Sequence, residues 1–145
     1  MNNEITSNEL VAGSSSNDAI TTGNGNDTIM GSLGNDTINA QEGMDWISYK
    51  DIITTPYDED QKGIKLSLSS DNTTLNIYNS HYYYEKNDNG DTKQNHTWQS
   101  AFSDEILNVE GIYATDKDDV IEGNDHNNII NAGLGQDAIF GSAGN

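Results

Sequence analysis

Side chains that carry oxygen recur at a spacing of nine or eighteen residues near both ends of the chain. At such a spacing each would hold the same place on successive turns of a repeating structure. Carboxylates next to glycine-rich turns, whose backbone carbonyls are accessible, can surround a divalent cation that prefers oxygen ligands. The spacing therefore predicts cation binding, and the residues in this phase are Glu9, Asp18, Asp27, Asp36, Asp45, Asp119, Asn128 and Asp137.

An aliphatic residue follows each of these side chains by two positions. From Gly13 the chain reads GSSSNDAIT, TGNGNDTIM, GSLGNDTIN and AQEGMDWIS, and the same frame returns as ATDKDDVIE, GNDHNNIIN and AGLGQDAIF. Agreement of seven blocks in both phases excludes a chance pattern. The aliphatic residues are Val11, Ile20, Ile29, Ile38, Ile47, Ile121, Ile130 and Ile139.

Each block predicts a tight turn followed by a short strand. Glycine and asparagine in the first half permit positive φ, and the last three residues, such as Thr28-Ile29-Met30, favour an extended strand. Alternation along that strand directs the central isoleucine to one face. Because so short a strand cannot bury its isoleucine alone, we expect stacked coils of two blocks each, with the isoleucines in a continuous ladder.

These blocks resemble the nonapeptide repeats of the RTX (repeats-in-toxin) or haemolysin-type calcium-binding family, whose pattern is a calcium-binding β-helix signature. The resemblance covers about residues 4–48 and 107–145. It implies an all-β fold, a right-handed parallel β-roll with a non-repeat β insert in the middle. The pattern is weakest at Ser16, Lys117 and His126, which replace the fourth-place glycine, and at Asn128, which replaces an aspartate.

The resemblance also implies the metal ligands. Each calcium ion would lie between two turns on one edge of the roll, with one acid from each turn. The implied pairs are Asp18 with Asp36, Asp27 with Asp45, Asp119 with Asp137, and Glu9 with Asp27. Residues of the turns would complete the shells, and they are Ser14, Ser16, Thr22, Gly23, Asn24, Gly25, Gly31, Leu33, Gly34, Gly43, Gly133 and Gly135.

The alternative for these acids is a solvated charged face. Stacked carboxylates would lie ~5 Å apart, the spacing of neighbouring strands, and would repel each other without a cation. Zinc is disfavoured because cysteine is absent and the three histidines are scattered. Magnesium is disfavoured because it requires a small octahedral shell. Several calcium ions are therefore the expected cofactors.

The composition limits the classes of partner. The 145 residues carry 24 acids against six lysines, and the formal charge of −18 would repel nucleic acid and anionic membranes. No stretch is apolar enough to span a bilayer, and residues 1–10 lack the apolar run of a classical signal peptide. Hydrophobic residues make up only 32%, so repeat order or bound cations must offset the chain entropy.

The middle of the chain breaks the period. We divide one continuous domain into repeats at residues 1–48, a non-repeat β segment at 49–106, and repeats at 107–145. Alternation predicts strands at residues 63–68 and 106–113, with a long loop at about 70–101. Asp88-Asn89-Gly90-Asp91 is typical of a turn. Aromatic residues of the loop either cover the side of the coil or bind a ligand, and they are Tyr82, Tyr83, Tyr84 and Trp98.

No Ser-His-Asp set, paired catalytic acids or HExxH motif is apparent, so we expect a structural calcium-binding module and not an enzyme. The resemblance implies a larger bacterial protein that is exported by type I secretion, lies outside the cell or on its surface, and folds on binding calcium. The last block stops at Asn145 before its expected acid, which suggests an excised fragment. The alternatives are an adhesin segment that binds a host glycan or protein through the tyrosine-rich loop, and an accessory domain of an extracellular enzyme.

Overall fold

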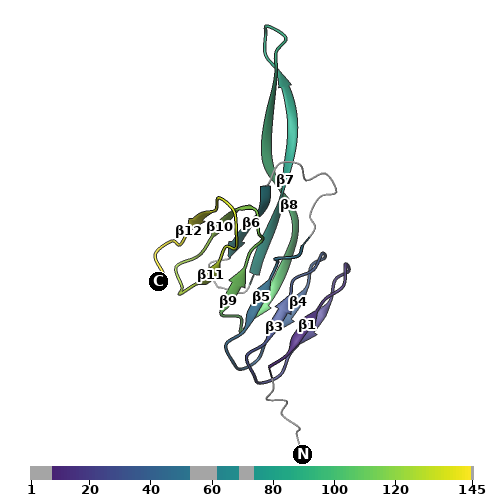
Figure 1. Cartoon of the computed structure of the whole chain (residues 1–145). Coiled ribbons are helices and arrows are strands. Elements are labelled where there is room, and N and C mark those ends of the chain that lie inside the picture. Colours follow the sequence, from purple (N-terminus) through teal and green to yellow (C-terminus); the bar gives the residue numbers. More distant parts are fainter. Residues whose placement is uncertain (1–7, 53–61, 69–73, 145) are drawn as a thin grey trace, which may run out of the picture.

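The computed structural model describes residues 8–52, 62–68 and 74–144. Twelve strands and the turns between them make up this part of the chain, and none of it is helical (Figure 1). The strands are β1 (Leu10–Ala12), β2 (Ala19–Thr21), β3 (Thr28–Met30), β4 (Thr37–Asn39), β5 (Trp46–Ser48), β6 (Lys62–Leu68), β7 (Thr74–Lys86), β8 (Thr92–Leu107), β9 (Gly111–Tyr113), β10 (Asp118–Glu122), β11 (Ile129–Asn131) and β12 (Ala138–Phe140).

The odd-numbered repeat strands form a five-stranded parallel sheet, called sheet A, in the order β1-β3-β5-β9-β11. The aliphatic residue of each strand lies directly beside that of the next. Neighbouring repeat strands are in this register because a coil of two blocks adds eighteen residues, and β9 keeps the same register beside β5 although a longer segment separates them in the chain. This register stacks Val11, Ile29, Ile47, Ile112 and Ile130.

The remaining strands form a seven-stranded sheet, called sheet B, in the order β12-β10-β6-β7-β8-β4-β2. Its repeat strands pair in parallel, and the ladder continues through Ile20, Ile38 and Ile106 at one end and through Leu66, Ile121 and Ile139 at the other. The antiparallel strand β7 joins the two halves, pairing with β6 on one side and β8 on the other. The expected all-β parallel roll with a β insert is confirmed.

The core lies between the two sheets and consists mainly of the isoleucine ladder. Ile29, Ile38 and Ile47 are fully buried, as is Ile64 in the insert. The ladder is less well covered at the C-terminal end, where the side chain of Ile139 is 51% exposed. Burial of this small apolar core therefore depends on stacking of successive coils, as a repeat structure requires.

Side-chain amides also bind successive coils together. The backbone N–H of Asn35 donates to the Asn17 side-chain oxygen at 2.9 Å, and that of Met44 donates to the Asn26 side-chain oxygen at 3.0 Å. Each contact joins residues eighteen positions apart. Fifth-place asparagines therefore hold the turns in register where no strand pairing exists.

The long loop expected at about 70–101 is wrong. This segment forms a β-hairpin of β7 and β8, which projects upward in Figure 1 from the middle of sheet B. Aromatic and β-branched residues favour strands, and the turn at residues 87–91 reverses the chain. Asn87 organises that turn by accepting the Asp91 N–H at 2.8 Å, with Gly90 at φ 83°.

The single strand expected at residues 106–113 is also wrong. The chain leaves β8 at Leu107, turns at Asn108 with φ 58°, and enters β9 at Gly111. One alternating run therefore supplies strands to both sheets. The strand expected at residues 63–68 is confirmed as β6.

Candidate metal centre

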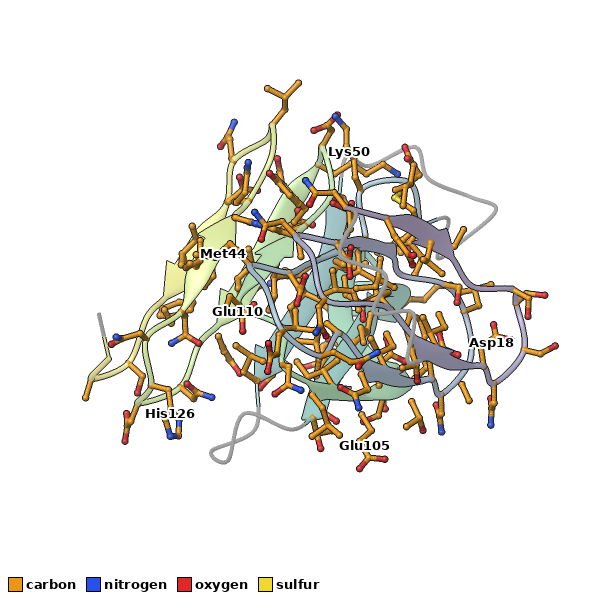
Figure 2. All side chains as sticks on the ribbon, turned by 90° about the horizontal axis from the view of Figure 1, so that it is seen from below. Asp18, Met44, Lys50, Glu105, Glu110 and His126 are labelled. Carbon is orange, nitrogen blue, oxygen red and sulfur yellow. The ribbon has the colours of Figure 1, made fainter. Side chains whose placement is uncertain are left out.

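The acidic residues, together with Asn128, form two rows, one along each edge of the roll. Edge A consists of the turns that precede the strands of sheet A, and edge B consists of the corresponding positions of sheet B. Figure 2 labels Glu110 of edge A and Asp18 of edge B. Edge A carries Glu9, Asp27, Asp45, Glu110 and Asn128, and edge B carries Asp18, Asp36, Asp104, Asp119 and Asp137.

On edge A each acid is tied to the turn of the preceding coil. The Glu9 N–H donates to Asp27 Oδ1 at 2.7 Å, and the Asp27 N–H donates to Asp45 Oδ1 at 2.7 Å. The Asp45 N–H donates in the same way to Glu110 Oε2 at 2.8 Å. The predicted neighbours Glu9–Asp27 and Asp27–Asp45 therefore lie together, and Glu110 extends the row.

The second carboxylate oxygens of Asp27 and Asp45 have no hydrogen-bond partner among the described residues. Both side chains are buried, with exposures of 1% and 0%. Burial raises the pKa of Asp45, and the charges of Asp27 and Glu110 raise it further, although a hydrogen bond from the Asp27 backbone lowers it. Buried unpaired carboxylates are costly, and a divalent cation with oxygen ligands is a chemically fitting partner for them.

Edge B repeats the same backbone contacts. The Asp18 N–H donates to Asp36 Oδ1 at 2.9 Å, and the Asp119 N–H donates to Asp137 Oδ1 at 2.9 Å. Both predicted pairs are thus brought together. Asp104 continues the row because its Oδ1 accepts the Asp36 N–H at 3.0 Å.

Hydroxyl groups distinguish edge B from edge A. Ser14 Oγ donates to Asp18 Oδ2 at 2.9 Å, Ser32 Oγ donates to Asp36 Oδ2 at 2.8 Å, and Thr115 Oγ1 donates to Asp119 Oδ1 at 2.8 Å. The hydroxyl therefore comes from the second place of the same block. Edge A has Gly23 and Gln41 at that place, so its acids have no equivalent donor.

The fourth donor of this kind is Tyr49, whose buried hydroxyl donates to Asp104 Oδ2. Burial raises the pKa of Asp104 to about 6, while the hydrogen bonds from Tyr49 and the Asp36 backbone lower it. Burial and the adjacent Asp104 charge raise the pKa of Tyr49 well above its ordinary value. Asp104 is thus a buried carboxyl held by a neutral phenol.

Glycines let the turns of successive coils approach closely. A Cβ on Gly43 would lie 1.7 Å from the Gly25 carbonyl oxygen, and one on Gly135 would lie 2.3 Å from the Lys117 carbonyl oxygen. Gly43 and Gly135 both have positive φ, at 152° and 124°. Stacked turns therefore bring backbone carbonyls to the rows of carboxylates, which is the ligand mixture that calcium accepts.

The other predicted turn ligands lie in these same stacked turns. The Thr22 carbonyl oxygen accepts a hydrogen bond from the Gln41 side chain. Gly31 lies under the Tyr49 ring, and a Cβ on Gly34 or Gly133 would meet the backbone of the preceding coil. The structure places Ser16, Gly23, Asn24, Gly25 and Leu33 in the turns before β2, β3 and β4. Their role as ligands stays a prediction.

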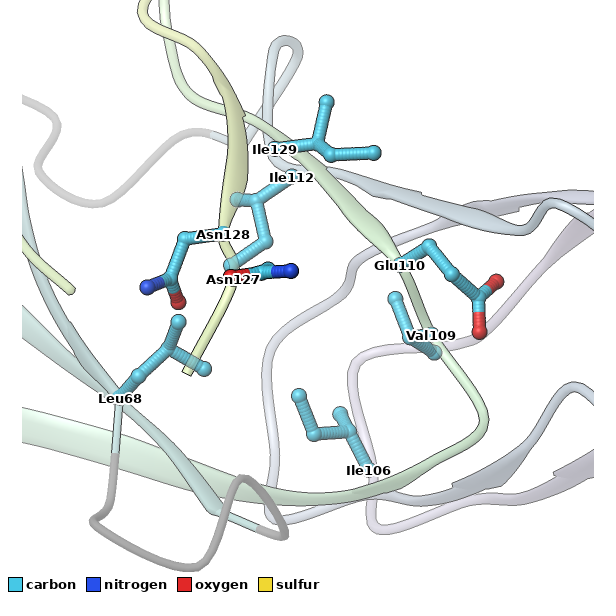
Figure 3. A pocket seen from close by; sticks show the side chains of 8 residues that line it. All are labelled: Leu68, Ile106, Val109, Glu110, Ile112, Asn127, Asn128 and Ile129. Carbon is cyan, nitrogen blue, oxygen red and sulfur yellow. The ribbon is translucent and has the colours of Figure 1, made fainter. Parts of the chain in front are cut away.

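Asn128 stands apart from the rest of edge A. Its Nδ2 donates to the carbonyl oxygens of Asn124 at 3.1 Å and His126 at 2.6 Å, while its Oδ1 has no partner among the described residues. Elsewhere on edge A, the backbone N–H of the acid on the preceding coil donates to the acid side chain. The Glu110 N–H donates to the Asp45 carbonyl oxygen instead of to Asn128. Figure 3 shows a small pocket here, with the Glu110 carboxylate directed away from Asn128.

Sequence reasoning missed Asp104, Glu110 and Tyr49. The two acids carry a signal that was available, since Ile106 and Ile112 follow them by two positions as in every repeat. Tyr49 carries no such signal, because only the folded roll brings it to Asp104.

Within residues 8–52, 62–68 and 74–144, no group of three or more His, Cys, Asp or Glu side chains is arranged to hold a metal ion; the carboxylates are arranged in successive pairs. The predicted ligand residues Tyr82, Tyr83, Tyr84 and Trp98 lie in the hairpin strands, but their side chains are outside the described set. No helix long and apolar enough to cross a membrane occurs in the described chain.

Comparison with known proteins identifies the repeats. The family model for the RTX calcium-binding nonapeptide repeat, in four copies, matches residues 6–47 and 112–145. Among curated proteins none matches the chain with significant similarity. The family match covers the turns that carry the predicted acid pairs and stops short of Asp104 and Glu110. This chain therefore belongs to the RTX calcium-binding nonapeptide repeat family, and it is a calcium-binding module of the RTX type.

Proposed function

We propose that the chain is a non-catalytic part of a larger bacterial protein that is exported by type I secretion and folds outside the cell when calcium binds. The observation that carries this proposal is on Asp27 and Asp45, where each buried carboxylate has one oxygen without a hydrogen-bond partner among the described residues. Folding without a cation leaves these charges uncompensated, so the folded state gains stability as calcium rises. Cytosolic calcium is too low to fill sites of extracellular affinity, which keeps the chain unfolded before export.

The proposed ligands are the successive acid pairs together with turn carbonyls. Asp27 belongs to two pairs of edge A, while Asp18, Asp36, Asp119 and Asp137 form the pairs of edge B. The net charge of −18 supports the same conclusion, because calcium also relieves the repulsion within the compact roll.

Circular dichroism during a calcium titration tests the proposal. We expect a coil-like spectrum in excess chelator and a β-sheet spectrum at millimolar calcium, with magnesium much less effective because it requires a smaller shell. A fully folded spectrum in chelator that calcium leaves unchanged would contradict calcium-driven folding.

A second candidate function rests on the hairpin. Beyond the segment that pairs with β6, strands β7 and β8 pair with each other and project from the roll (Figure 1). A projecting hairpin is a suitable element for a ligand-binding or adhesin segment. Glycan arrays probed with the calcium-loaded protein and with a variant lacking residues 79–99 test this candidate, which fails if both give the same binding pattern.

A further inference from the structure

Edge A continues across the insertion. Strand β5 ends at Ser48 and its neighbour β9 begins at Gly111, so residues 49–110 separate them in the chain. They nevertheless pair in register, with Trp46 beside Gly111 and Ile47 beside Ile112. The turn that carries Glu110 therefore lies on the turn that carries Asp45, as one repeat lies on another.

Close packing fixes this junction. A Cβ on Gly111 would lie 2.4 Å from the Trp46 ring, and the rings of Trp46 and Tyr113 have centroids 4.4 Å apart. Only a glycine at this position allows the indole to lie over the backbone. The relative position of Asp45 and Glu110 is thus set by the packing of the residues that follow them.

Glu110 makes toward Asp45 the contact that sixth-place aspartates make elsewhere. Its Oε2 accepts the Asp45 N–H at 2.8 Å, as Asp45 Oδ1 accepts the Asp27 N–H at 2.7 Å. Asp45 is fully buried and its Oδ2 lacks a partner among the described residues. Lys50 forms an ion pair with Asp116 at 3.3 Å and Lys65 forms one with Glu122 at 2.8 Å, so these two lysines pair with acids other than Asp45.

We propose that Asp45 and Glu110 form a further calcium site, which joins the last N-terminal repeat to the non-repeat turn after the insertion. This inference rests on the proposed calcium-dependent folding. It adds Glu110, which lies outside the residues matched by the repeat family, as a calcium ligand. Asp45 supplies a buried carboxylate, and Glu110, which is exposed, supplies the second carboxylate and leaves the ion accessible from solvent. Calcium there fastens both ends of residues 49–110 to one coil.

The variant Glu110→Gln separates a ligand from a mere hydrogen-bond acceptor. A glutamine oxygen can still accept the Asp45 N–H, so a purely structural role predicts wild-type behaviour. The substitution removes the negative charge of Glu110. If Glu110 is a calcium ligand, the variant should bind calcium more weakly, because calcium affinity depends on ligand charge. Glu105→Gln is the matched control, because Glu105 lies on the exposed periphery and its replacement removes the same charge (Figure 2).

Native mass spectrometry of the full chain in calcium counts the bound ions. We expect E110Q to hold one ion fewer than the wild type and E105Q to hold the wild-type number. Trp46 reports the junction directly when Trp98, the other tryptophan, is replaced in a Trp98→Phe background. There, E110Q is expected to move the midpoint of the calcium-dependent fluorescence change to higher calcium by on the order of tenfold.

The wild-type count distinguishes the two proposals. If the wild type binds no calcium, the proposed function fails; if it binds calcium and E110Q keeps both the count and the Trp46 midpoint, only the Asp45–Glu110 site is overturned. A crystal structure of the wild type grown in calcium locates the bound ions directly, without the use of a variant. An ion between Asp27 and Asp45 but none at Asp45 and Glu110 would also overturn the site, whereas an ion bridging Asp45 and Glu110 establishes it even if E110Q does not fold.

Discussion

At the scale of single residues, the aspartates at the sixth place of the repeats have different hydrogen-bond partners on the two edges. A serine or threonine hydroxyl partners Asp18, Asp36 and Asp119, while the second oxygens of Asp27 and Asp45 lack any partner among the described residues. A hydroxyl at the second place of the block therefore lowers the need for a cation at Asp18, Asp36 and Asp119, whereas the block of Asp137 has Gly133 at that place. Edge A has no such substitute, so calcium should matter most there.

The variant Asp27→Asn should act in opposite directions with and without calcium. An asparagine side chain can still accept the Glu9 N–H, but the change removes a charge shared by two pairs of edge A, so the apparent Kd should rise by about tenfold. In chelator the same change removes a buried unpaired charge and should increase the β-sheet signal. Calorimetry and circular dichroism measure the two effects, with the exposed turn variant Asp88→Asn as control. Equal calcium affinity for D27N and D88N would contradict the ligand role of Asp27.

Asp104 should make the calcium-free protein less stable as pH rises. Its pKa is about 6 in the roll against an ordinary 3.8, mainly because it is buried. The folded state therefore holds more protons than the unfolded chain between these values, and stability is lost as pH rises through this window. Asp45 and Asp119 have pKa values raised in the same direction.

We therefore expect more β structure in chelator at pH ~5 than at pH ~7.5. Asp104→Asn should weaken this dependence, since it removes the group with the pKa of about 6. Circular dichroism of both proteins in chelator at the two pH values measures it. A β-sheet signal that increases with pH in chelator would show that other groups dominate the linkage.

At the scale of elements, the turns are as specific as the strands. Gly43 has φ 152° and carries no side chain, because the Gly25 carbonyl occupies the space where a Cβ would lie. At Gly141, no atom of the described residues apart from its own chain neighbours lies within 4 Å of the corresponding position. Two glycines in the same type of repeat therefore differ in what they contribute.

The variant Gly43→Ala should destabilise the calcium-loaded protein by about 2 kcal/mol, because it combines backbone strain with overpacking against the Gly25 carbonyl. It should also weaken calcium binding, since that carbonyl lies in a predicted ligand turn. Gly141→Ala should change stability by less than about 0.5 kcal/mol. Thermal unfolding in saturating calcium compares them, and equal effects would show that the turns do not stack as described.

At the scale of the whole molecule, the insertion belongs partly to the roll and partly outside it. Leu75, Ile77 and Phe102 lie in the core, and β6 and β8 are interior strands of sheet B. In the far part of the hairpin, residues 79–99, the residues of β7 pair with those of β8. The one further pairing is at the base, where Asn79 also lies beside Ile64 of β6. Stability of the roll should therefore depend on the base of the hairpin and not on its tip.

Replacing residues 79–99 with a two-residue Asn-Gly turn tests this division, since Tyr78 and Ser100 are direct partners across the hairpin. We expect the calcium midpoint to be unchanged and the Tm in calcium to stay within about 5 °C of the wild type. The matched core variant Ile77→Ala should cost about 2–5 kcal/mol. A shortened protein that no longer folds with calcium would place the whole hairpin in the structural unit.

The sequence alone determined the repeats, the two blocks per coil, the isoleucine ladder and the acid pairs separated by eighteen residues. These features are local and periodic, so one block specifies its own turn and strand, and stacking is the only way to bury the isoleucines. The pairs Asp18–Asp36, Asp27–Asp45 and Asp119–Asp137 accordingly lie where the spacing places them.

Only the tertiary structure decided how residues 49–110 enter the roll. Alternation predicts a strand but not its partner, so the hairpin, the antiparallel β7 and the split at Asn108 could not be derived from the pattern. The contact of Tyr49 with Asp104 and that of Glu110 with Asp45 join residues 55 and 65 positions apart. Such contacts depend on which coils become neighbours, and that choice is made by packing of the entire core.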